Sequence, residues 1–397
     1  MADHPIRDDI RLLEGSFYVD RPLEHYEWMR ANAPVYRDPV GEIWGVALHE
    51  DIMHCSKTPK IFCSGKSSRP EEGSWIPSMI NLDDPDHKRR RNLVNRGFTP
   101  RRVSDHAPLI RQVVTQLIDV VAEKGSCDFV REIAAPLPMA IIGTLLGVAE
   151  EDWDTLLHWS EDMLRGTDAG ATDEARSNAM QAGAAYATYA MNVISERRKE
   201  SREDLMGILV DAEIDGERLE DQELIQESLL ILVGGDETTR HVISGGMQAL
   251  IENPDQRQKL IDDPARIPTA VEEMLRWVTP IKNMNRTALE DTVLRDQKIR
   301  EGDKLLLLYQ SGNRDERIFD EPKKFDVERN PNDHVAFGGY GTHFCLGAPL
   351  ARLELQIMFE ELLRRLPDME IDGKLPLRPS NFIVGIEEMP VVFTPAR

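Results

Sequence analysis

The segment 221–253 limits the possible folds more than any other part of this sequence. Its helical pattern continues for 33 residues until Pro254 ends it,. At ~1.5 Å per residue such a helix would span roughly 50 Å, which is long for a globular protein. The strand-like pieces, such as 304–309 and 389–394, are short by comparison. The sequence therefore predicts a mainly α fold, a large helical bundle with a smaller β-rich part.

The organisation of the chain and its charge narrow the possibilities further. No linker rich in Ser, Gly and Pro divides the 397 residues, and no segment repeats at a fixed period. We therefore expect a single domain over residues 1–397. The formal net charge of −22 argues against a general nucleic-acid-binding protein,.

Cysteine usage and the N-terminus bear on the cellular compartment. Four cysteines in a chain of this size do not form a disulfide framework and indicate a reducing compartment,. The N-terminal segment MADHPIRDDIRLLEG lacks the apolar core of a secretory signal,. The longest uncharged run, 133–149, is broken by prolines and is too short to span a bilayer,. We expect a cytoplasmic protein with no stable membrane insertion.

The stretch FGGYGTHFCLG, residues 337–347, places four glycines around one thiol. That thiol, Cys345, directly precedes an expected helix, whose free N–H groups and positive end would stabilise a thiolate. A lone thiolate with no partner cysteine suits an axial ligand of heme iron. The alternative is a buried cysteine in a glycine-rich turn, which is the commoner fate of an isolated cysteine.

The middle of the long helix contains GGDETT, residues 234–239. Two glycines inside a helix cost about 1–2 kcal/mol relative to alanine, so we expect a flat cofactor or a substrate to approach the backbone here. Glu237 and Thr238 would place a carboxyl and a hydroxyl beside this gap, where they could deliver protons to a bound oxygen ligand. The alternative is a helix kink in which a threonine bonds back to a carbonyl.

Two charged patterns are weaker evidence. EEMLR places Glu273 and Arg276 on one helix face, which by itself usually means a surface ion pair,. The run HKRRRNLVNRGFTPRR, residues 87–102, has seven Lys or Arg and no acid. Its His87 and Arg91 share a helix face that could bind the propionates of heme. Its other arginines could contact an acidic protein partner, or could form a solvated charged face.

These four motifs, in this order, resemble the cytochrome P-450 heme-thiolate monooxygenases over essentially the whole chain. The resemblance implies the cytochrome P-450 fold, heme b (iron protoporphyrin IX) as the cofactor and O2 as a substrate. In its length and in lacking an appended flavin domain, the chain resembles the bacterial type of the family. That type receives electrons from a ferredoxin, which a ferredoxin reductase reduces with NAD(P)H.

The resemblance implies how heme would be held. Cys345 matches the thiolate ligand of the iron. His87, Arg91 and His343 match contacts to the heme propionates. Arg286, in NMNRTA, matches a further propionate-binding arginine.

The resemblance also implies catalytic and structural roles. Glu237 and Thr238 match the acid–alcohol pair of oxygen activation. Glu273 and Arg276 match a structural pair that family members lock with a downstream arginine, and Arg329 in FDVERNP fits that place. We expect these last three residues to hold the fold and to take no part in catalysis.

The cysteine loop departs from the commonest bacterial spacing. Phe337 lies eight residues before Cys345, where seven is usual, because GGYG contains an extra residue. Several actinobacterial sterol-oxidising members have this longer loop. Whether Phe337 or Tyr340 packs on the sulfur side of heme is left open.

Five segments are similar to a narrower group, the actinobacterial cholesterol and cholest-4-en-3-one 26-monooxygenases: MRANAPVYRD, CDFVREIAAPLPMAIIGTLLGV, LLILVGGDETTRHVISGG, EEMLRWVTPIKNMNR and MPVVFTP. This similarity implies hydroxylation of the terminal methyl (C26/C27) of the sterol side chain, with oxidation on to the carboxylic acid as a further step. The alternatives are a hydroxylase of another lipid (a fatty acid or a terpene), a peroxide-using heme enzyme, and a heme-binding sensor without catalysis.

Residues of the substrate cavity are inferred from where the family contacts its substrates. They lie in the irregular loop 63–87, on the long helix, after Pro280 and near the C-terminus: Ile76, Met79, Val233, Gly234, Ile281, Met284 and Val384. An apolar residue at any one of these positions is more often ordinary core.

Overall fold

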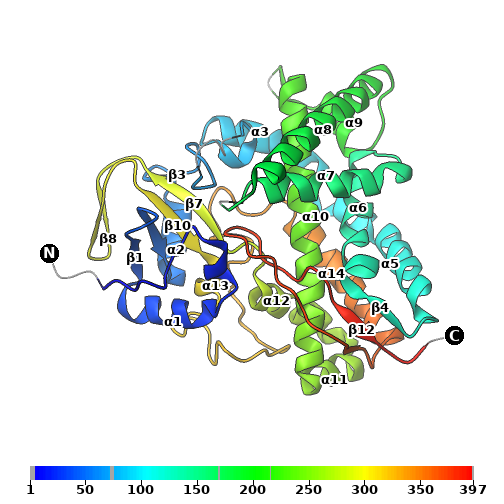
Figure 1. Cartoon of the computed structure of the whole chain (residues 1–397). Helices are drawn as coiled ribbons and strands as arrows, with labels where there is room; N and C mark the ends of the chain where they lie inside the picture. The colour runs from blue at the N-terminus through cyan, green and yellow to red at the C-terminus, as the bar shows by residue number, and fades with distance from the viewer. Residues whose placement is uncertain (1–4, 72–75, 169, 215, 396–397) are drawn as a thin grey trace.

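The computed structural model of the chain describes residues 5–71, 76–168, 170–214 and 216–395. Figure 1 shows a smaller β-rich part, which contains the N-terminal segments, beside a larger helical part. The helices are α1 (Pro22–Asn32), α2 (His49–Lys57), α3 (Asp86–Val94), α4 (Pro100–Asp105), α5 (Ala107–Ala122), α6 (Pro136–Leu146), α7 (Trp153–Gly166), α8 (Asp173–Lys199), α9 (Leu205–Asp211), α10 (Asp221–Glu252), α11 (Pro254–Asp262), α12 (Ile267–Val278), α13 (Tyr309–Gly312) and α14 (Ala348–Arg365). The expected mainly α fold is confirmed.

The strands are short, as the sequence predicted. They are β1 (Val35–Asp38), β2 (Ile43–Val46), β3 (Phe62–Cys63), β4 (Ser126–Asp128), β5 (Glu213–Ile214), β6 (Glu217–Arg218), β7 (Asn283–Ala288), β8 (Thr292–Leu294), β9 (Gln297–Ile299), β10 (Lys304–Leu308), β11 (Glu370–Ile371) and β12 (Pro390–Val392). The main sheet has the order β1-β2-β10-β7-β3, in which β10 pairs parallel with β2 and antiparallel with β7. A smaller sheet has the order β11-β12-β4.

Helix α10 runs along the middle of the helical part (Figure 1), and α6, α12 and α14 pack against it. A capping box fixes its start, where the backbone N–H of Glu220 donates to Glu223 Oε2 at 3.0 Å,. The helix ends at Glu252 because Pro254 begins α11 and cannot continue the same hydrogen-bond ladder,. The long helix expected from the sequence is confirmed, and it ends one residue earlier than expected.

Buried apolar side chains form a large cluster in the helical part and two smaller clusters on the faces of the main sheet. The large cluster contains the inner faces of α5, α6, α10, α12 and α14. In β10 the buried leucines alternate between the two smaller clusters, since successive strand residues point to opposite faces,. Both faces of the sheet are thereby fixed against helices, with α1 on one side and α2 on the other.

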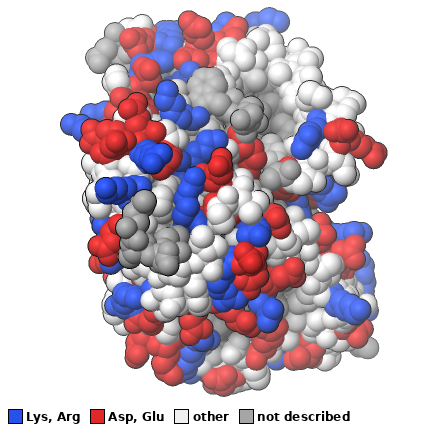
Figure 2. Space-filling model, turned by 60° about the vertical axis from the view of Figure 1, so that its left-hand side comes forward, with Lys and Arg blue, Asp and Glu red and all other residues white. Residues whose placement is uncertain are grey.

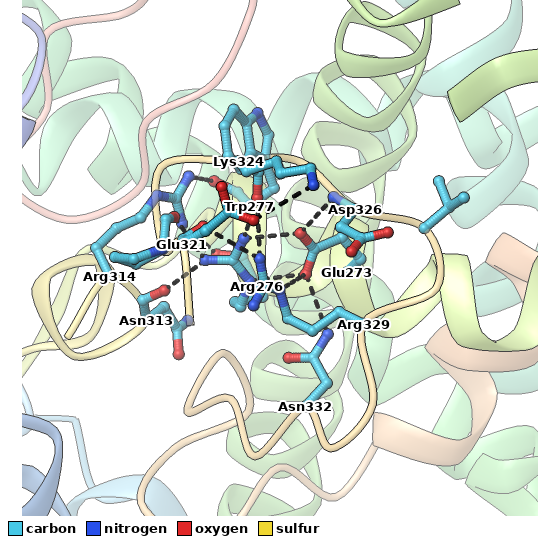
Figure 3. Close-up of polar contacts among 12 residues, drawn as sticks. Glu273, Arg276, Trp277, Asn313, Arg314, Glu321, Lys324, Asp326, Arg329 and Asn332 are labelled. Atoms are coloured by element: carbon cyan, nitrogen blue, oxygen red, sulfur yellow. Dashed lines mark hydrogen bonds and ion pairs between the residues drawn. The ribbon is translucent and has the colours of Figure 1, made fainter. Parts of the chain in front are cut away.

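A buried ion-pair network connects α12 with the chain that leads to the cysteine loop (Figure 3). Arg276 donates from Nε and Nη2 to the two oxygens of Glu273, both at 2.7 Å, and neither side chain is exposed. Arg329 donates from Nε to Glu273 Oε2 at 3.1 Å. Arg276 also donates to backbone carbonyls within the segment 313–324. The pair is therefore not the surface ion pair that the sequence left open.

Charge on the surface is mixed where it can be seen. On the face shown in Figure 2, acidic and basic side chains are interspersed, so the excess of acid does not collect there in one patch. Among the described residues, we find no helix with the length and apolar character needed to cross a membrane.

Candidate functional site

A largely apolar cavity lies between the middle of α10 and the glycine-rich loop 337–347. Residues from α3, α6, α12, β7 and the first turns of α14 complete its walls. The cavity therefore lies where the helical part meets the main sheet. It brings the two glycine-containing motifs of the sequence to opposite walls, although they are about a hundred residues apart in the chain.

Cys345 is open toward this cavity and is otherwise enclosed by protein. Backbone N–H groups of Gly347 and Ala348, at the start of α14, donate to its sulfur. Burial raises the pKa of the Cys345 thiol, whereas these N–H groups and the Arg91 guanidinium lower it,. The N–H groups at the helix end therefore favour the thiolate against the effect of burial. A bound metal ion would ionise the thiol.

The glycines shape the cysteine loop. Gly338 has a φ of 96°, a left-handed conformation that glycine adopts without strain,. Gly341 passes so close to α2 that a Cβ atom there would lie 1.9 Å from the carbonyl oxygen of Ser56. With the chain turned in this way, the N–H of Cys345 donates to the carbonyl of Phe337 at 3.0 Å.

Of the two aromatic residues that the sequence left open, Phe337 lines the cavity and Tyr340 does not; Phe344, next to Cys345, lines it as well. Tyr340 is absent from the cavity wall, is 44% exposed and stacks on Phe344 with ring centroids 5.1 Å apart. The guanidinium of Arg352 lies over the Phe337 ring at 4.7 Å and holds it in place,. In this longer loop Tyr340 lies toward the surface and Phe337 lies at the cavity.

Four basic side chains meet at one edge of the cavity: His87, Arg91, Arg286 and His343. The two imidazole rings are 4.2 Å apart. Burial, followed by the charges of Arg286, His87 and Arg91, lowers the pKa of His343 to about 2. The one acid that pairs with the cluster in the described part of the chain is Asp84, 3.2 Å from His87 Nδ1. This edge has more positive charge than its acid neutralises.

These residues fit heme b. No group of three or more His, Cys, Asp or Glu in the described ranges could hold a bare metal ion, so an iron at Cys345 needs ligands from a cofactor. The basic edge suits the two anionic propionates. His87 Nε2 is buried there without a hydrogen-bond partner among the described residues. The thiol, the basic edge and the apolar walls together match a flat, amphipathic iron porphyrin.

Both glycines of the α10 pair line the cavity, and Gly235 also allows α10 to pack closely on α6. Gly234 lines the cavity, and a Cβ atom there would meet nothing within 4 Å. A Cβ atom on Gly235 would lie 2.6 Å from Ile142 of α6, so this glycine permits close helix packing. Thr238 lines the cavity, and its hydroxyl donates to the carbonyl of Gly234 at 2.8 Å. That back-bond was the alternative role considered for the threonine, and it coexists with a position facing the cavity.

Glu237 is buried but is not part of the cavity wall. Its carboxylate pairs with Arg240 and lies 3.0 Å from His241 Nε2. Burial opposes ionisation, yet the His241 hydrogen bond and the Arg240 charge hold the pKa of Glu237 well below its usual range. Arg240 also donates to Glu161 of α7 at 2.7 Å. The Glu237 carboxyl, expected from the sequence to face the cavity, therefore points away from it into a network with Arg240 and His241.

Four of the seven residues inferred for the substrate cavity line it: Met79, Gly234, Ile281 and Met284. The other three residues are not part of the cavity wall in this structure. Ile76 is 45% exposed at the surface. Val233, on α10 next to Gly234, does not line the cavity. Val384 is buried in the cluster between α1 and the sheet.

Several residues of the cavity wall were not expected from the sequence. Leu230 and Val242 line the cavity from α10, four residues before Gly234 and four after Thr238. Helical periodicity extended from the glycine pair would have found both. Phe98 and Ile142 also line it, from segments far away in the sequence, and no local pattern indicates them.

The Cys345 thiol, the basic edge of the cavity and the open space beside Gly234 of α10 are together typical of a heme-thiolate protein. The model of the cytochrome P-450 family matches residues 71–382, and the chain belongs to that family. Its members bind heme b, which agrees with the residues at the cavity.

Full-length relatives and solved structures support this assignment. The chain is 48% identical over 393 residues to a steroid C26-monooxygenase of Mycolicibacterium smegmatis, covering 98% of this chain and 97% of that protein. It is 38% identical to a methyl-branched lipid omega-hydroxylase of Mycobacterium tuberculosis, with 98% and 92% covered. A Mycobacterium marinum cytochrome P-450 in complex with pseudoionone superposes with a TM-score of 0.90 at 34% identity, over 99% of this chain and all of that one.

Proposed function

We propose that this protein hydroxylates the terminal methyl (C26/C27) of the side chain of cholesterol or cholest-4-en-3-one, and oxidises it further to the acid. The first step is RH + O2 + 2e⁻ + 2H⁺ giving ROH and water, and each further oxidation toward the acid would consume another O2 and two more electrons. The main support is the steroid C26-monooxygenase relative, at 48% identity over nearly the whole chain. The apolar cavity with Cys345 on one wall and Thr238 on another is the matching structural feature.

Each part of the cavity has a proposed task. Bound heme would supply the activation of O2 and the transfer of one oxygen atom to carbon. Cys345 would bind the iron, and the basic edge would hold the propionates. The apolar walls would exclude water and present one end of the ligand, because strong terminal C–H bonds can be selected only by positioning. Thr238 would hold a hydroxyl beside the reacting end, and Glu237 would supply protons when it leaves Arg240 and His241.

The proposal also covers the number of domains, the cellular compartment and the electron source. We propose a single domain over residues 1–397 in the cytoplasm, which the four unpaired cysteines support,. We propose a ferredoxin, with its reductase and NAD(P)H, as the electron source.

A spin-state titration tests the substrate. Cholest-4-en-3-one is expected to shift the Soret band of the holoenzyme to the high-spin form, and product analysis is expected to place the new oxygen at C26 or C27. A methyl-branched fatty acid and a terpene serve as competitors. A shift with the fatty acid alone would replace the sterol by a branched lipid, which the omega-hydroxylase relative makes the second candidate.

Replacing Thr238 by alanine is expected to separate reductant use from product formation. The variant removes the one hydroxyl of the GGDETT motif that we assign to proton delivery, so sterol product per reductant should fall ~10-fold or more, with the remainder recovered as hydrogen peroxide. Ser244→Ala is the matched control, because its hydroxyl also bonds back to the carbonyl four residues earlier on α10 and it is not part of the cavity wall. Unchanged coupling in Thr238→Ala would remove Thr238 from proton delivery. Turnover with hydrogen peroxide equal to that with ferredoxin would identify a peroxide-using enzyme instead.

A further inference from the structure

Part of the basic run of α3 faces the interior of the protein. Arg90 is only 8% exposed and pairs with two acids of α10, Glu223 at 2.9 Å and Glu227 at 3.0 Å. Arg89 also pairs with Glu223, at 2.8 Å. The interpretation of these arginines as a surface for an acidic partner, or as a solvated face, is therefore wrong for Arg90. Its guanidinium has an internal function.

Glu227 joins three segments of the chain. Its side chain is fully buried, and its Oε1 accepts both from Arg90 and from the backbone N–H of Met79, at 2.8 Å. Arg90 donates in addition to the carbonyl of Pro77. The other carboxylate oxygen, Oε2, is buried and has no hydrogen-bond partner among the described residues. One carboxylate thus ties the segment 77–79 to both α3 and α10.

This contact lies at one end of the cavity. Met79 and its neighbour Ile80 line the cavity. On α10, Glu227 precedes Leu230, Gly234 and Thr238 by three, seven and eleven residues, so all four share one helix face. Eleven residues correspond to roughly 16 Å along the helix axis. The contact of Glu227 with Arg90 and Met79 therefore lies well away from Thr238, along the wall that an elongated ligand would follow.

We propose that Glu227, with Arg90, is a positioning residue that fixes Met79 and Ile80 and thereby sets how deeply an elongated apolar substrate enters the cavity. This inference rests on the proposed terminal oxidation, because only depth distinguishes a terminal methyl from the carbons behind it. Glu227 does not touch the reacting end. It acts through the backbone position of Met79.

The position of segment 77–79 should depend strongly on the Glu227 carboxylate. Removing it would leave the Met79 N–H and the Arg90 guanidinium without their buried acceptor, and a buried donor that makes no hydrogen bond is destabilising. An isosteric amide would keep an acceptor for the Met79 N–H and lose only the charge. The two substitutions therefore separate the hydrogen bond from the ion pair.

The first test compares Glu227→Leu, Glu227→Gln and the control Glu223→Gln as holoenzymes. Glu223 also pairs with Arg90, but among the described residues it forms no hydrogen bond with segment 77–79. Glu227→Leu is expected to weaken cholest-4-en-3-one binding roughly tenfold and to shift part of the product away from C26/C27. Glu227→Gln should restore most of the regioselectivity at pH 8, and Glu223→Gln should retain it. Wild-type affinity and regioselectivity in heme-loaded Glu227→Leu would overturn the proposal.

A pH comparison decides the matter if Glu227→Leu does not fold. Burial raises the pKa of Glu227 to about 7 against the opposing effect of Arg90. The charged groups that face it are Arg89 and Arg90 of α3 and Glu223 of α10, while Met79 contributes only its N–H. Below pH 7 the protonated carboxyl loses its ion pair with Arg90 but keeps an acceptor for the Met79 N–H, as the amide does. Wild-type sterol affinity should therefore fall between pH 8 and pH 6 to the level of Glu227→Gln, whose affinity should not change over this range. An equal fall in both proteins would overturn the proposal.

The outcome is separable from that of the proposed function. If cholest-4-en-3-one causes no spin shift in the wild type, the sterol assignment fails, and the same variants are then compared with phytanic acid as the probe. A fall in affinity and a spread of hydroxylation along its chain in Glu227→Leu would still support the positioning role. Identical behaviour of the wild type and Glu227→Leu with that probe would refute it.

Discussion

Replacing Cys345 by serine is expected to abolish the thiolate signature and the activity together. The reduced, carbon-monoxide-bound wild type should show the red-shifted Soret band of thiolate ligation, and the variant should lose it. A serine hydroxyl is a far weaker electron donor than a thiolate, which promotes O–O cleavage. Steroid hydroxylation should fall by ~10³-fold or more, as expected for loss of a group that acts directly on the reaction.

Cys127→Ser is the matched control for this experiment. Cys127 lies in β4, paired with Val391 of β12, and is not part of the cavity wall. It should keep both the red-shifted band and the activity. A Cys345→Ser protein that retained the red-shifted band would show that another group binds the iron, and the assignment of the cavity would fall.

Much of the site could be predicted because its residues occur in short, continuous motifs. Cys345 and the glycines around it are contiguous, and the requirement for a tight turn before a helix is local,. His87 and Arg91 are one helical turn apart, so their shared face follows from periodicity alone. Gly234 and Thr238 follow in the same way along α10. All five named residues line the cavity: His87, Arg91, Gly234, Thr238 and Cys345.

The failures arise where tertiary packing decides the direction of a side chain. A run of arginines looks solvent-facing in the sequence, and only the approach of α10 shows that Arg90 has buried acids to pair with. Glu237 lies beside Thr238 in the sequence but about 100° away around the helix, where Arg240 and His241 hold it,. Whether Val384 reaches the cavity depends on which face of the main sheet its segment covers, and it packs in the cluster on the α1 side. Such information lies in contacts between distant segments and not in any local pattern.

Replacing Glu273 by glutamine is expected to cause the largest loss of stability. Its carboxylate, completely buried, accepts hydrogen bonds from Arg276, Arg329, the backbone N–H of Asp326 and the side chain of Asn332 (Figure 3). Removing one partner of a buried ion pair typically costs about 3–5 kcal/mol, because the remaining charge is left without compensation. Denaturant unfolding of the holoenzyme measures this loss.

The consequence should extend from stability to heme retention, because the network anchors the segment that leads into the cysteine loop. Glu273→Gln is therefore expected to release heme at lower denaturant concentration than the wild type and to lose the red-shifted Soret band in parallel with unfolding. Glu27→Gln is the control, since Glu27 pairs with Lys323 at the exposed surface and its loss should cost about 0.5 kcal/mol or less,. If Glu273→Gln unfolded together with this control, the buried network would not hold the loop, and the cysteine would owe its position to the packing of α14 alone.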